Sequence, residues 1–310
     1  MRRRVKPRFA AKPSPARSRP DVAGHVISRR VDLPAAGVML AADLWEPATH
    51  PRGTVVLMHG GGQTRHSWNR TGERLVRHGF RALSVDARGH GESQWAPDGD
   101  YSTDVMVADL LAIVGRLDQR PVLVGASMGG VTSLVALGEH GPFARGLVLV
   151  DVVANMRPEG VQRVRDFMLG APDGFDSLEE VAAAVRSYTP HRRRAVDLDG
   201  LRKNVRRRQN GRWYWHWDPA WGGPDGMPDI DALRRRMEAA ARSVHVPTLV
   251  VRGLRSDVTD DTGVRELVDM IPDARTIGVA DAGHMLAGDD NDVFTATLQA
   301  FLDDLPADPP

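Results

Sequence analysis

Short apolar runs alternate with segments of helical periodicity along most of this chain. Apolar runs bounded by Gly, Pro or Asp are typical of buried strands, whereas apolar residues at helical spacing predict helices that cover a sheet. Strands that alternate with helices indicate an α/β fold with a mostly parallel central sheet and helices on both faces. The predicted strands lie at residues 25–32, 38–45, 54–58, 80–85, 121–124, 146–150, 246–253 and 276–279, and the predicted helices include residues 67–78, 103–117 and 131–139.

The alternation stops after Asp151, and only helical patterns such as residues 178–188 and 230–242 appear before the next predicted strand. We interpret this segment as a helical cap inserted over the C-terminal edge of the sheet. Such a cap encloses a substrate and excludes water. The predicted organisation is an α/β core at residues 22–151 and 244–305, with a cap insertion at residues 152–243.

One predicted strand leads directly into the sequence Gly125-Ala126-Ser127-Met128-Gly129, and a helical pattern follows. A serine on such a strand–turn–helix connection is held in a strained backbone conformation that exposes its hydroxyl. The flanking glycines let the strand and the helix pass close to each other. Gly-x-Ser-x-Gly alone is a weak signal, but in this context it predicts Ser127 as a nucleophile.

A serine nucleophile needs an imidazole that takes its proton and a third group that orients the imidazole. His284 follows the last predicted strand in a Gly-flanked loop, where such a base is expected. Asp257 follows the strand at residues 246–253. All three side chains come just after the C-terminal ends of strands, where open α/β sheets build their sites. We therefore predict a catalytic triad of Ser127, Asp257 and His284.

The acid of this triad has a competitor, because Asp151 directly follows the strand at residues 146–150. Asp257 is favoured because its loop is long enough to curl back beneath an imidazole, and Gly253 supplies the flexibility for that turn. Asp151 is expected to mark the start of the cap.

A glycine loop, His59-Gly60-Gly61-Gly62, follows the strand at residues 54–58. Its backbone can offer an N–H group without obstruction by a side chain. We predict that the N–H groups of Gly61 and Met128 form an oxyanion hole. His59 and His90 are expected to be hydrogen-bonding residues of the core rather than bases.

These motifs together resemble the α/β-hydrolase superfamily over roughly residues 22–305, and within it the bacterial capped serine esterases. In that superfamily the loop that begins at Asp86 is structural, and the match around Arg252 to Asp257 places the acid at Asp257. The motifs that carry the resemblance are His59-Gly60-Gly61-Gly62, Asp86-Ala87-Arg88-Gly89-His90-Gly91-Glu92-Ser93, Gly125-Ala126-Ser127-Met128-Gly129-Gly130, Arg252-Gly253-Leu254-Arg255-Ser256-Asp257 and Ala282-Gly283-His284-Met285.

The resemblance implies a serine hydrolase that cleaves a carboxylic ester or lactone through an acyl-enzyme, with no cofactor. Three alternatives keep the same triad: C–C bond hydrolysis, perhydrolysis and acyl transfer. A further alternative is a small-molecule receptor that keeps the hydrolase fold. Epoxide hydrolases and haloalkane dehalogenases use a carboxylate at the elbow, and position 127 is serine.

The formal net charge of +1 conceals an uneven distribution. Residues 1–20 contain eight Lys/Arg and no acid, so the rest of the chain is acidic. This basic, Pro-rich tail cannot bury enough apolar surface to fold, and we predict disorder for residues 1–21 and flexibility for residues 306–310. The tail lacks the apolar stretch of a secretory signal, which favours a cytoplasmic protein.

The remaining composition excludes several classes of site. The chain contains no cysteine, no run of 18 apolar residues and no recognisable metal-ligand spacing. These features exclude a thiol nucleophile and predict neither a metal site nor a membrane span.

Two features of the cap have alternative interpretations. Trp213, Trp215 and Trp217 alternate along one segment, and packing of the cap onto the sheet is favoured over an aromatic substrate wall. Nine Lys/Arg lie between His191 and Arg212. Solvated helix faces are favoured over attraction of anionic substrates or nucleic acid, so no nucleic-acid partner is predicted.

Overall fold

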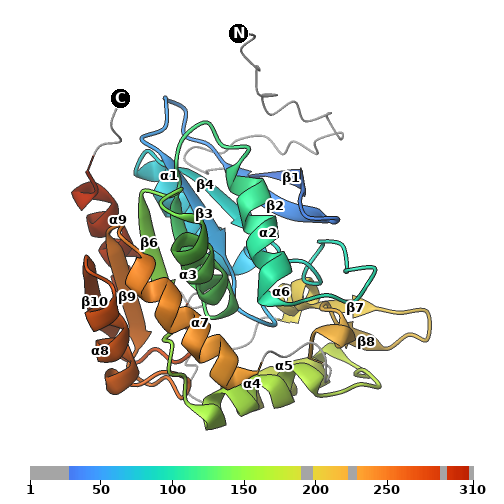
Figure 1. Cartoon of the computed structure of the whole chain (residues 1–310). Helices are drawn as coiled ribbons and strands as arrows, with labels where there is room; N and C mark the ends of the chain where they lie inside the picture. The colour runs from blue at the N-terminus through green and yellow to red at the C-terminus, as the bar shows by residue number, and fades with distance from the viewer. Residues whose placement is uncertain (1–27, 190–197, 223–228, 287–291, 307–310) are drawn as a thin grey trace.

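The computed structural model describes residues 28–189, 198–222, 229–286 and 292–306 (Figure 1). The predicted disordered tail at residues 1–21 and most of the predicted flexible C-terminus lie outside these ranges. An eight-stranded sheet forms the centre, in the order β1-β2-β4-β3-β5-β6-β9-β10. The strands are β1 (Ser28–Pro34), β2 (Met39–Trp45), β3 (Thr54–Met58), β4 (Arg81–Val85), β5 (Val122–Ala126), β6 (Gly146–Val150), β9 (Thr248–Gly253) and β10 (Ala274–Val279).

The sheet is mostly parallel, as the alternation of strands and helices predicts. Only β1 with β2 and β2 with β4 pair antiparallel, and the strands from β4 to β10 pair parallel. Every residue of β3, β5 and β6 is buried. Strands that are continuously apolar must be covered on both faces, which explains why these runs show no polar alternation.

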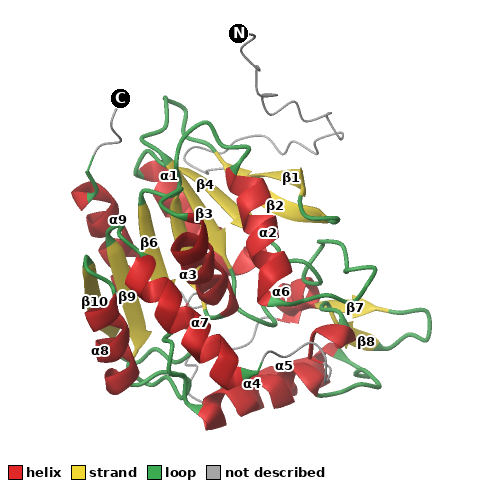
Figure 2. Cartoon of the chain, viewed as in Figure 1, coloured by secondary structure: helices red, strands yellow, loops and turns green. Residues whose placement is uncertain are grey.

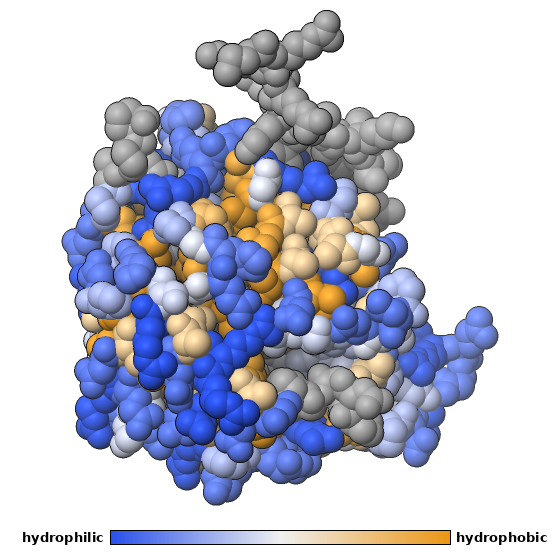
Figure 3. All heavy atoms as spheres, viewed as in Figure 1, coloured by the Kyte–Doolittle hydropathy of each residue, from blue (hydrophilic) through white to orange (hydrophobic). Residues whose placement is uncertain are grey.

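Helices cover the two faces of the sheet in separate layers (Figures 1 and 2). On one face, α2, α3, α7 and α8 share a continuous apolar cluster with the sheet. On the other face, α1 and α9 pack against a second cluster. Apolar side chains show on the surface over α2 and α3, whereas the region of the cap is mostly polar (Figure 3). The bounds are α1 (Asn69–Arg77), α2 (Thr103–Val114), α3 (Met128–His140), α7 (Ile230–Ser243), α8 (Asp261–Met270) and α9 (Asp292–Asp304), and a 3-10 turn, η1 (Arg65–Trp68), precedes α1.

The cap is a small layer with its own apolar centre. Met168, Phe175, Val181, Trp215 and Trp217 are buried together in it. It is not purely helical, because β7 and β8 form a two-stranded antiparallel sheet. These strands are three residues each, too short to show a period in the sequence. The elements are α4 (Pro158–Leu169), α5 (Leu178–Tyr188), α6 (Leu198–Leu201), η2 (Arg202–Asn204), β7 (Val205–Arg207), β8 (Trp213–Trp215) and η3 (Pro219–Gly222).

Helix α7 lies within the segment predicted as cap but packs in the core. Met237, Ala240 and Ala241 are buried in the same cluster as α3. Gly138 of α3 faces Ala240 so closely that an added Cβ would come within 2.4 Å of the Ala240 Cα. The predicted insertion at residues 152–243 therefore extends too far, because the amphipathic face of α7 covers the sheet and not the cap.

Replacement of Gly138 by Ala tests this packing. Alanine favours a helix by about 1 kcal/mol relative to glycine, but here its Cβ would meet backbone atoms that cannot move aside. We expect a net loss of about 1–2 kcal/mol in the free energy of unfolding, measured by urea denaturation.

Gly53→Ala is the matched control. An added Cβ there would meet only the flexible Arg145 side chain at 3.3 Å and the Phe80 ring at 3.7 Å. This variant should keep wild-type stability. Equal stability of the two variants would contradict close packing between α3 and α7.

Candidate active site

Ser127 occupies a tight turn between β5 and α3. Its backbone has φ 44° and ψ −115°, a conformation that L-residues rarely adopt. An added Cβ on Gly125 would lie 2.3 Å from the carbonyl oxygen of Gly129, and one on Gly129 would lie 2.5 Å from the carbonyl oxygen of Met58. Only glycine fits at these two positions, so the strained turn that the motif predicts is present.

His284 connects Ser127 to a buried carboxylate. Its Nε2 lies 3.1 Å from the Ser127 Oγ, and its Nδ1 lies 2.7 Å from the Asp151 Oδ2. The Asp151 side chain is fully buried and the His284 side chain nearly so. Because the carboxylate accepts from Nδ1–H, Nε2 carries the free lone pair and faces the serine hydroxyl. This arrangement is that of a nucleophile, a base and an orienting acid.

The hydrogen bonds of Asp151 define its orientation. Oδ2 also accepts from the Ser256 hydroxyl at 2.5 Å, and Oδ1 accepts from the Thr259 hydroxyl at 2.8 Å and the Gly253 N–H at 3.1 Å. These donors compensate for the loss of water around a buried charge. They come from β9 and the loop after it, the loop that was predicted to supply the acid itself.

The structure does not place Asp257 beside His284, contrary to the prediction. Asp257 pairs with Arg163 of α4, and its side chain is 35% exposed. The cause is the strand order, in which β6 lies next to β5 and β9 lies one strand farther away. A carboxylate directly after β6 therefore lies next to the elbow. Asp151, the competitor considered above, occupies the position predicted for Asp257.

The glycine loop lies beside the serine, since an added Cβ on Gly60 would be 3.3 Å from the Ser127 Cβ. The carbonyl of Gly60 accepts from the His59 Nδ1 at 2.8 Å and from the Gln63 N–H at 3.1 Å. In a trans peptide the N–H points away from the C=O, so this anchoring turns the Gly61 N–H to the opposite side. Within the described residues, neither the Gly61 N–H nor the Met128 N–H has an acceptor. Both predicted oxyanion donors are thus available.

Residues of the cap cover the glycine loop. The position of a Cβ on Gly61 is 3.2 Å from both the Met168 Sδ and the Trp221 ring, and that of Gly62 is 3.5 Å from Trp217. Trp217 in turn stacks on Trp215 with 4.8 Å between the ring centroids. These tryptophans pack within the cap rather than onto the sheet as predicted, because Trp215 and Trp217 are buried in the cap's own cluster and Trp213 packs against it.

Three buried histidines lie behind the glycine loop. The ring centroids of His59 and His90 are 5.3 Å apart, and those of His90 and His216 are 5.8 Å apart. Burial lowers the pKa of each ring, and the neighbouring His59 ring reinforces the effect at His90, whose pKa falls to about 3. All three are therefore neutral at physiological pH. His59 and His90 have the hydrogen-bonding roles that the sequence predicts, whereas His216 carried no sequence signal.

The loop after β4 is structural, as the resemblance implies for Asp86. Asp86 is fully buried and accepts from the Arg65 N–H at 2.6 Å, the Arg65 guanidinium at 2.5 Å and the Glu92 N–H at 2.9 Å. An added Cβ on Gly91 would lie 2.1 Å from an Asp86 oxygen, which explains the glycine. The loop therefore wraps around the carboxylate.

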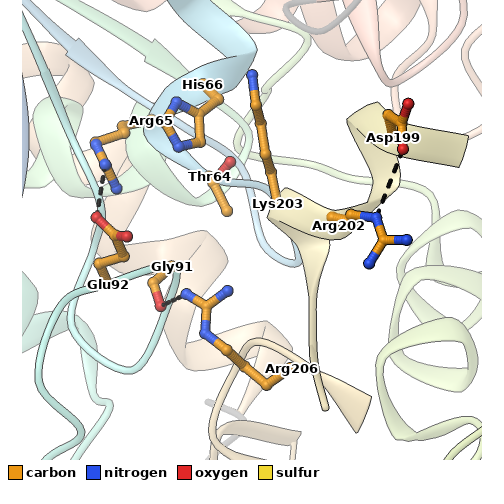
Figure 4. Close-up of a pocket in the computed structure, with 9 residues that line it drawn as sticks. All are labelled: Thr64, Arg65, His66, Gly91, Glu92, Asp199, Arg202, Lys203 and Arg206. Carbon is orange, nitrogen blue, oxygen red and sulfur yellow. Dashed lines mark hydrogen bonds and ion pairs between the residues drawn. The ribbon is translucent and has the colours of Figure 1, made fainter. Parts of the chain in front are cut away.

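A separate cavity of about 350 Å³ lies between this loop and the cap (Figure 4). Arg206 donates to the Gly91 carbonyl at 2.6 Å, and Arg202 lies 3.5 Å from Asp199. Its charges are mixed, and no residue of the triad lines it. The lining residues are Thr64, Arg65, His66, Gly91, Glu92, Asp199, Arg202, Lys203 and Arg206.

The structure also bears on the metal site, the membrane span and the basic segment considered in the sequence. Among the described residues, no cluster of His, Asp or Glu has an arrangement that would hold a metal ion. In the same part of the chain, no helix combines the length and the apolar character needed to cross a bilayer. Of the basic segment, Arg202 and Arg207 stack on Trp213 and Arg208 on Tyr214, while residues 192–194 lie outside the described residues.

Residues 53–290 match the α/β hydrolase fold family, and the chain therefore belongs to this family. The chain is 28% identical over 267 residues to the esterase Rv0045c of Mycobacterium tuberculosis, with 80% of this chain and 82% of that protein covered. A solved structure of that esterase matches with a TM-score of 0.68 at 27% identity, covering 91% of this chain and 94% of the other. The 3-hydroxybutyrate-oligomer hydrolase of Cupriavidus necator is 28% identical, covering 81% of this chain and 88% of the relative. The predicted resemblance is confirmed, and the chain is an α/β hydrolase.

The buried histidines predict a loss of stability in mild acid. Their pKa values in the folded state lie below the value of about 6.5 in an unfolded chain. The stability that these neutral histidines contribute is therefore fully present above that pH. It is lost as the pH decreases below it, because the unfolded chain binds protons that the folded protein does not bind. Each histidine contributes up to about 1.4 kcal/mol per pH unit between its folded and its unfolded pKa.

The measurement is urea unfolding between pH 5 and pH 7. His216→Gln should reduce the slope of stability against pH by about one proton. Phe175→Leu, which weakens the cap without removing a titrating group, should lower the stability and leave the slope unchanged. An unaltered slope in His216→Gln would contradict a neutral, buried His216.

Proposed function

We propose that this chain hydrolyses a carboxylic ester or lactone through an acyl-enzyme, with Ser127 as nucleophile, His284 as base and Asp151 as orienting acid. The observation that carries the proposal is the continuous contact from the Ser127 Oγ through both ring nitrogens of His284 to the Asp151 carboxylate. The esterase relatives support the reaction class.

In the first half of the reaction, the Ser127 Oγ attacks the carbonyl carbon and its proton passes to the His284 Nε2. The carbonyl oxygen becomes an oxyanion, which accepts hydrogen bonds from the N–H groups of Gly61 and Met128. The intermediate collapses with cleavage of the bond to the alcohol oxygen. His284 then gives its proton to that oxygen, and Ser127 remains acylated.

In the second half, water replaces the alcohol. His284 removes a proton from water as the water oxygen adds to the acyl carbon. Collapse breaks the bond to the Ser127 Oγ, which recovers its proton from His284 and releases the carboxylic acid. Asp151 stabilises the imidazolium twice in each turnover, and its buried hydrogen bonds keep it oriented.

The surroundings of the glycine loop favour an apolar group on the substrate. Met168, Trp217 and Trp221 from the cap lie against Gly61 and Gly62. These side chains form an apolar surface beside the loop, which suits an ester or lactone with an apolar acyl or alcohol group.

The same triad would also serve C–C bond hydrolysis, perhydrolysis or acyl transfer, and these remain predictions from the sequence. The ester reaction is preferred because of the esterase relatives. A receptor without catalysis is disfavoured because Ser127, His284 and Asp151 lie at hydrogen-bonding distances. The predicted cytoplasmic location likewise remains a prediction.

Ser127→Ala should reduce kcat for a p-nitrophenyl ester by about 10⁶ and abolish labelling by a fluorophosphonate. The methyl group fits the space of the serine, so the melting temperature should stay close to that of the wild type. More than a few per cent of wild-type activity in the purified variant would refute Ser127 as the nucleophile.

The identity of the acid is tested by comparing two isosteric variants. Asp151→Asn should lower kcat by about 10⁴, because the amide favours the wrong tautomer of His284. Asp257→Asn should retain kcat, because Asp257 pairs with Arg163 of α4 and, among the described residues, makes no hydrogen bond to His284. Circular dichroism of both variants controls for folding. The reverse pattern of activities would restore Asp257 as the acid.

A further inference from the structure

His216 of the cap is buried at the contact between the cap and the glycine loop, with 1% of its surface exposed. Its Nδ1 lies 2.7 Å from the N–H of Gly91, and its Nε2 lies 3.4 Å from the carbonyl oxygen of Gly62. A backbone N–H can only donate, so Nδ1 must be the acceptor. The neutral ring therefore carries its proton on Nε2, directed at Gly62.

The other two histidines have the opposite tautomer for the same reason. The His59 Nε2 accepts from the Ala87 N–H at 3.0 Å, so its Nδ1–H donates to the Gly60 carbonyl. The His90 Nε2 accepts from the Gly62 N–H at 3.2 Å, so its Nδ1–H donates to the Arg88 carbonyl. In each ring, one nitrogen bonds to the glycine loop and the other to the segment at residues 87–91.

These contacts fall on three successive peptide groups of the loop. His59 holds the peptide between Gly60 and Gly61, which carries the predicted oxyanion donor. His90 holds the next peptide through the Gly62 N–H, and His216 holds the one after through the Gly62 carbonyl. We propose that His216 is a positioning residue through which the cap fixes the oxyanion loop, a role that rests on the function proposed above.

His216 itself is anchored firmly enough for this role. The peptide nitrogen of Gly91 donates to its Nδ1, while the carbonyl of Gly91 accepts from Arg206 of β7 at 2.6 Å (Figure 4). Two residues farther along the cap, the Asp218 N–H donates to the Gly89 carbonyl at 2.9 Å, and Tyr101 donates to the Asp218 carboxylate at 2.5 Å. Cap residues before and after His216 in the chain are thus hydrogen-bonded to the core.

The bond from His216 to Gly62 is long, so its loss should loosen the loop rather than dismantle it. Gly62 has φ 70° and no side chain to restrict it, so the backbone of the loop depends on these hydrogen bonds for its orientation. A misdirected Gly61 N–H weakens binding of the oxyanion more than binding of the neutral substrate. The effect should therefore appear in kcat and not in KM.

Two amide substitutions separate the two contacts of the ring. His216→Asn places a carbonyl near the position of Nδ1 and keeps the acceptor for Gly91, but it has no donor that reaches Gly62. His216→Gln places its amide near the position of Nε2 and keeps that donor. We expect kcat for a p-nitrophenyl ester to fall about tenfold in His216→Asn, a fraction of the 10²–10³ that follows removal of a whole donor. In His216→Gln it should fall less than threefold.

A trifluoromethyl ketone reports on the oxyanion hole directly, because it adds to the serine as a tetrahedral oxyanion. Its Ki should rise about tenfold in His216→Asn, with KM changed less than twofold. Phe175→Leu, which loosens the cap away from the glycine loop, should lower the melting temperature and leave kcat and Ki unchanged. Equal kcat and Ki in His216→Asn and wild type would overturn the proposal, as would loss of kcat in Phe175→Leu.

A measurement on the unaltered protein covers the case in which His216→Asn fails to fold. Two-bond ¹⁵N NMR of the imidazoles should show His216 as the Nε2–H tautomer and His59 and His90 as Nδ1–H tautomers. An Nδ1–H tautomer at His216 would overturn the proposal regardless of activity. Inactivity of the wild type towards all esters would instead refute the proposed function and leave the tautomer result intact.

Discussion

The close crossing of β5 and α3 at Ser127 is the constraint on which the site depends. The backbone atoms of Gly125, Gly129 and Met58 lie where any side chain would collide. The Gly129 N–H also donates to the His59 carbonyl at 3.2 Å, which ties the first turn of α3 to the strand that bears the glycine loop. One crossing thus strains the serine and holds it against the glycine loop, where an added Cβ on Gly60 would lie 3.3 Å from the Ser127 Cβ.

Strain of this kind persists only if the surrounding structure is rigid. Here β3, β5 and β6 are buried throughout, and α3 and α7 pack almost backbone to backbone at Gly138. The same rigidity holds Asp151, which also has a positive φ, of 51°. Two unfavourable backbone conformations therefore stand at the ends of adjacent strands, and the packing of the sheet sustains both.

The cap covers the glycine loop and also forms hydrogen bonds with the backbone of the core. Its apolar side chains Met168, Trp217 and Trp221 lie over the glycine loop, while His216 and Arg206 bond to the backbone of the loop after β4. Buried polar groups of this kind are costly unless each is satisfied, and the three histidines use all six ring nitrogens. The cap thus both covers the glycine loop and holds the backbone of the neighbouring loop in place.

The sequence by itself determined the features that depend on residues close together along the chain. Apolar runs and helical spacing predicted the alternation of strands and helices, and Gly-x-Ser-x-Gly after a strand predicted the strained turn at Ser127. His284 was identifiable because it follows the last strand in a Gly-flanked loop. Each of these signals is local, so no long-range pairing was needed to interpret it.

Only the tertiary structure decided which carboxylate His284 meets. Asp151 and Asp257 both follow strands, and the choice depends on β6 lying between β5 and β9, a pairing that joins distant segments. The same holds for α7, whose amphipathic pattern fits a cap or a core equally until its partner α3 is known. His216 had no signal at all, because its hydrogen bonds join the cap to loops more than a hundred residues earlier in the chain.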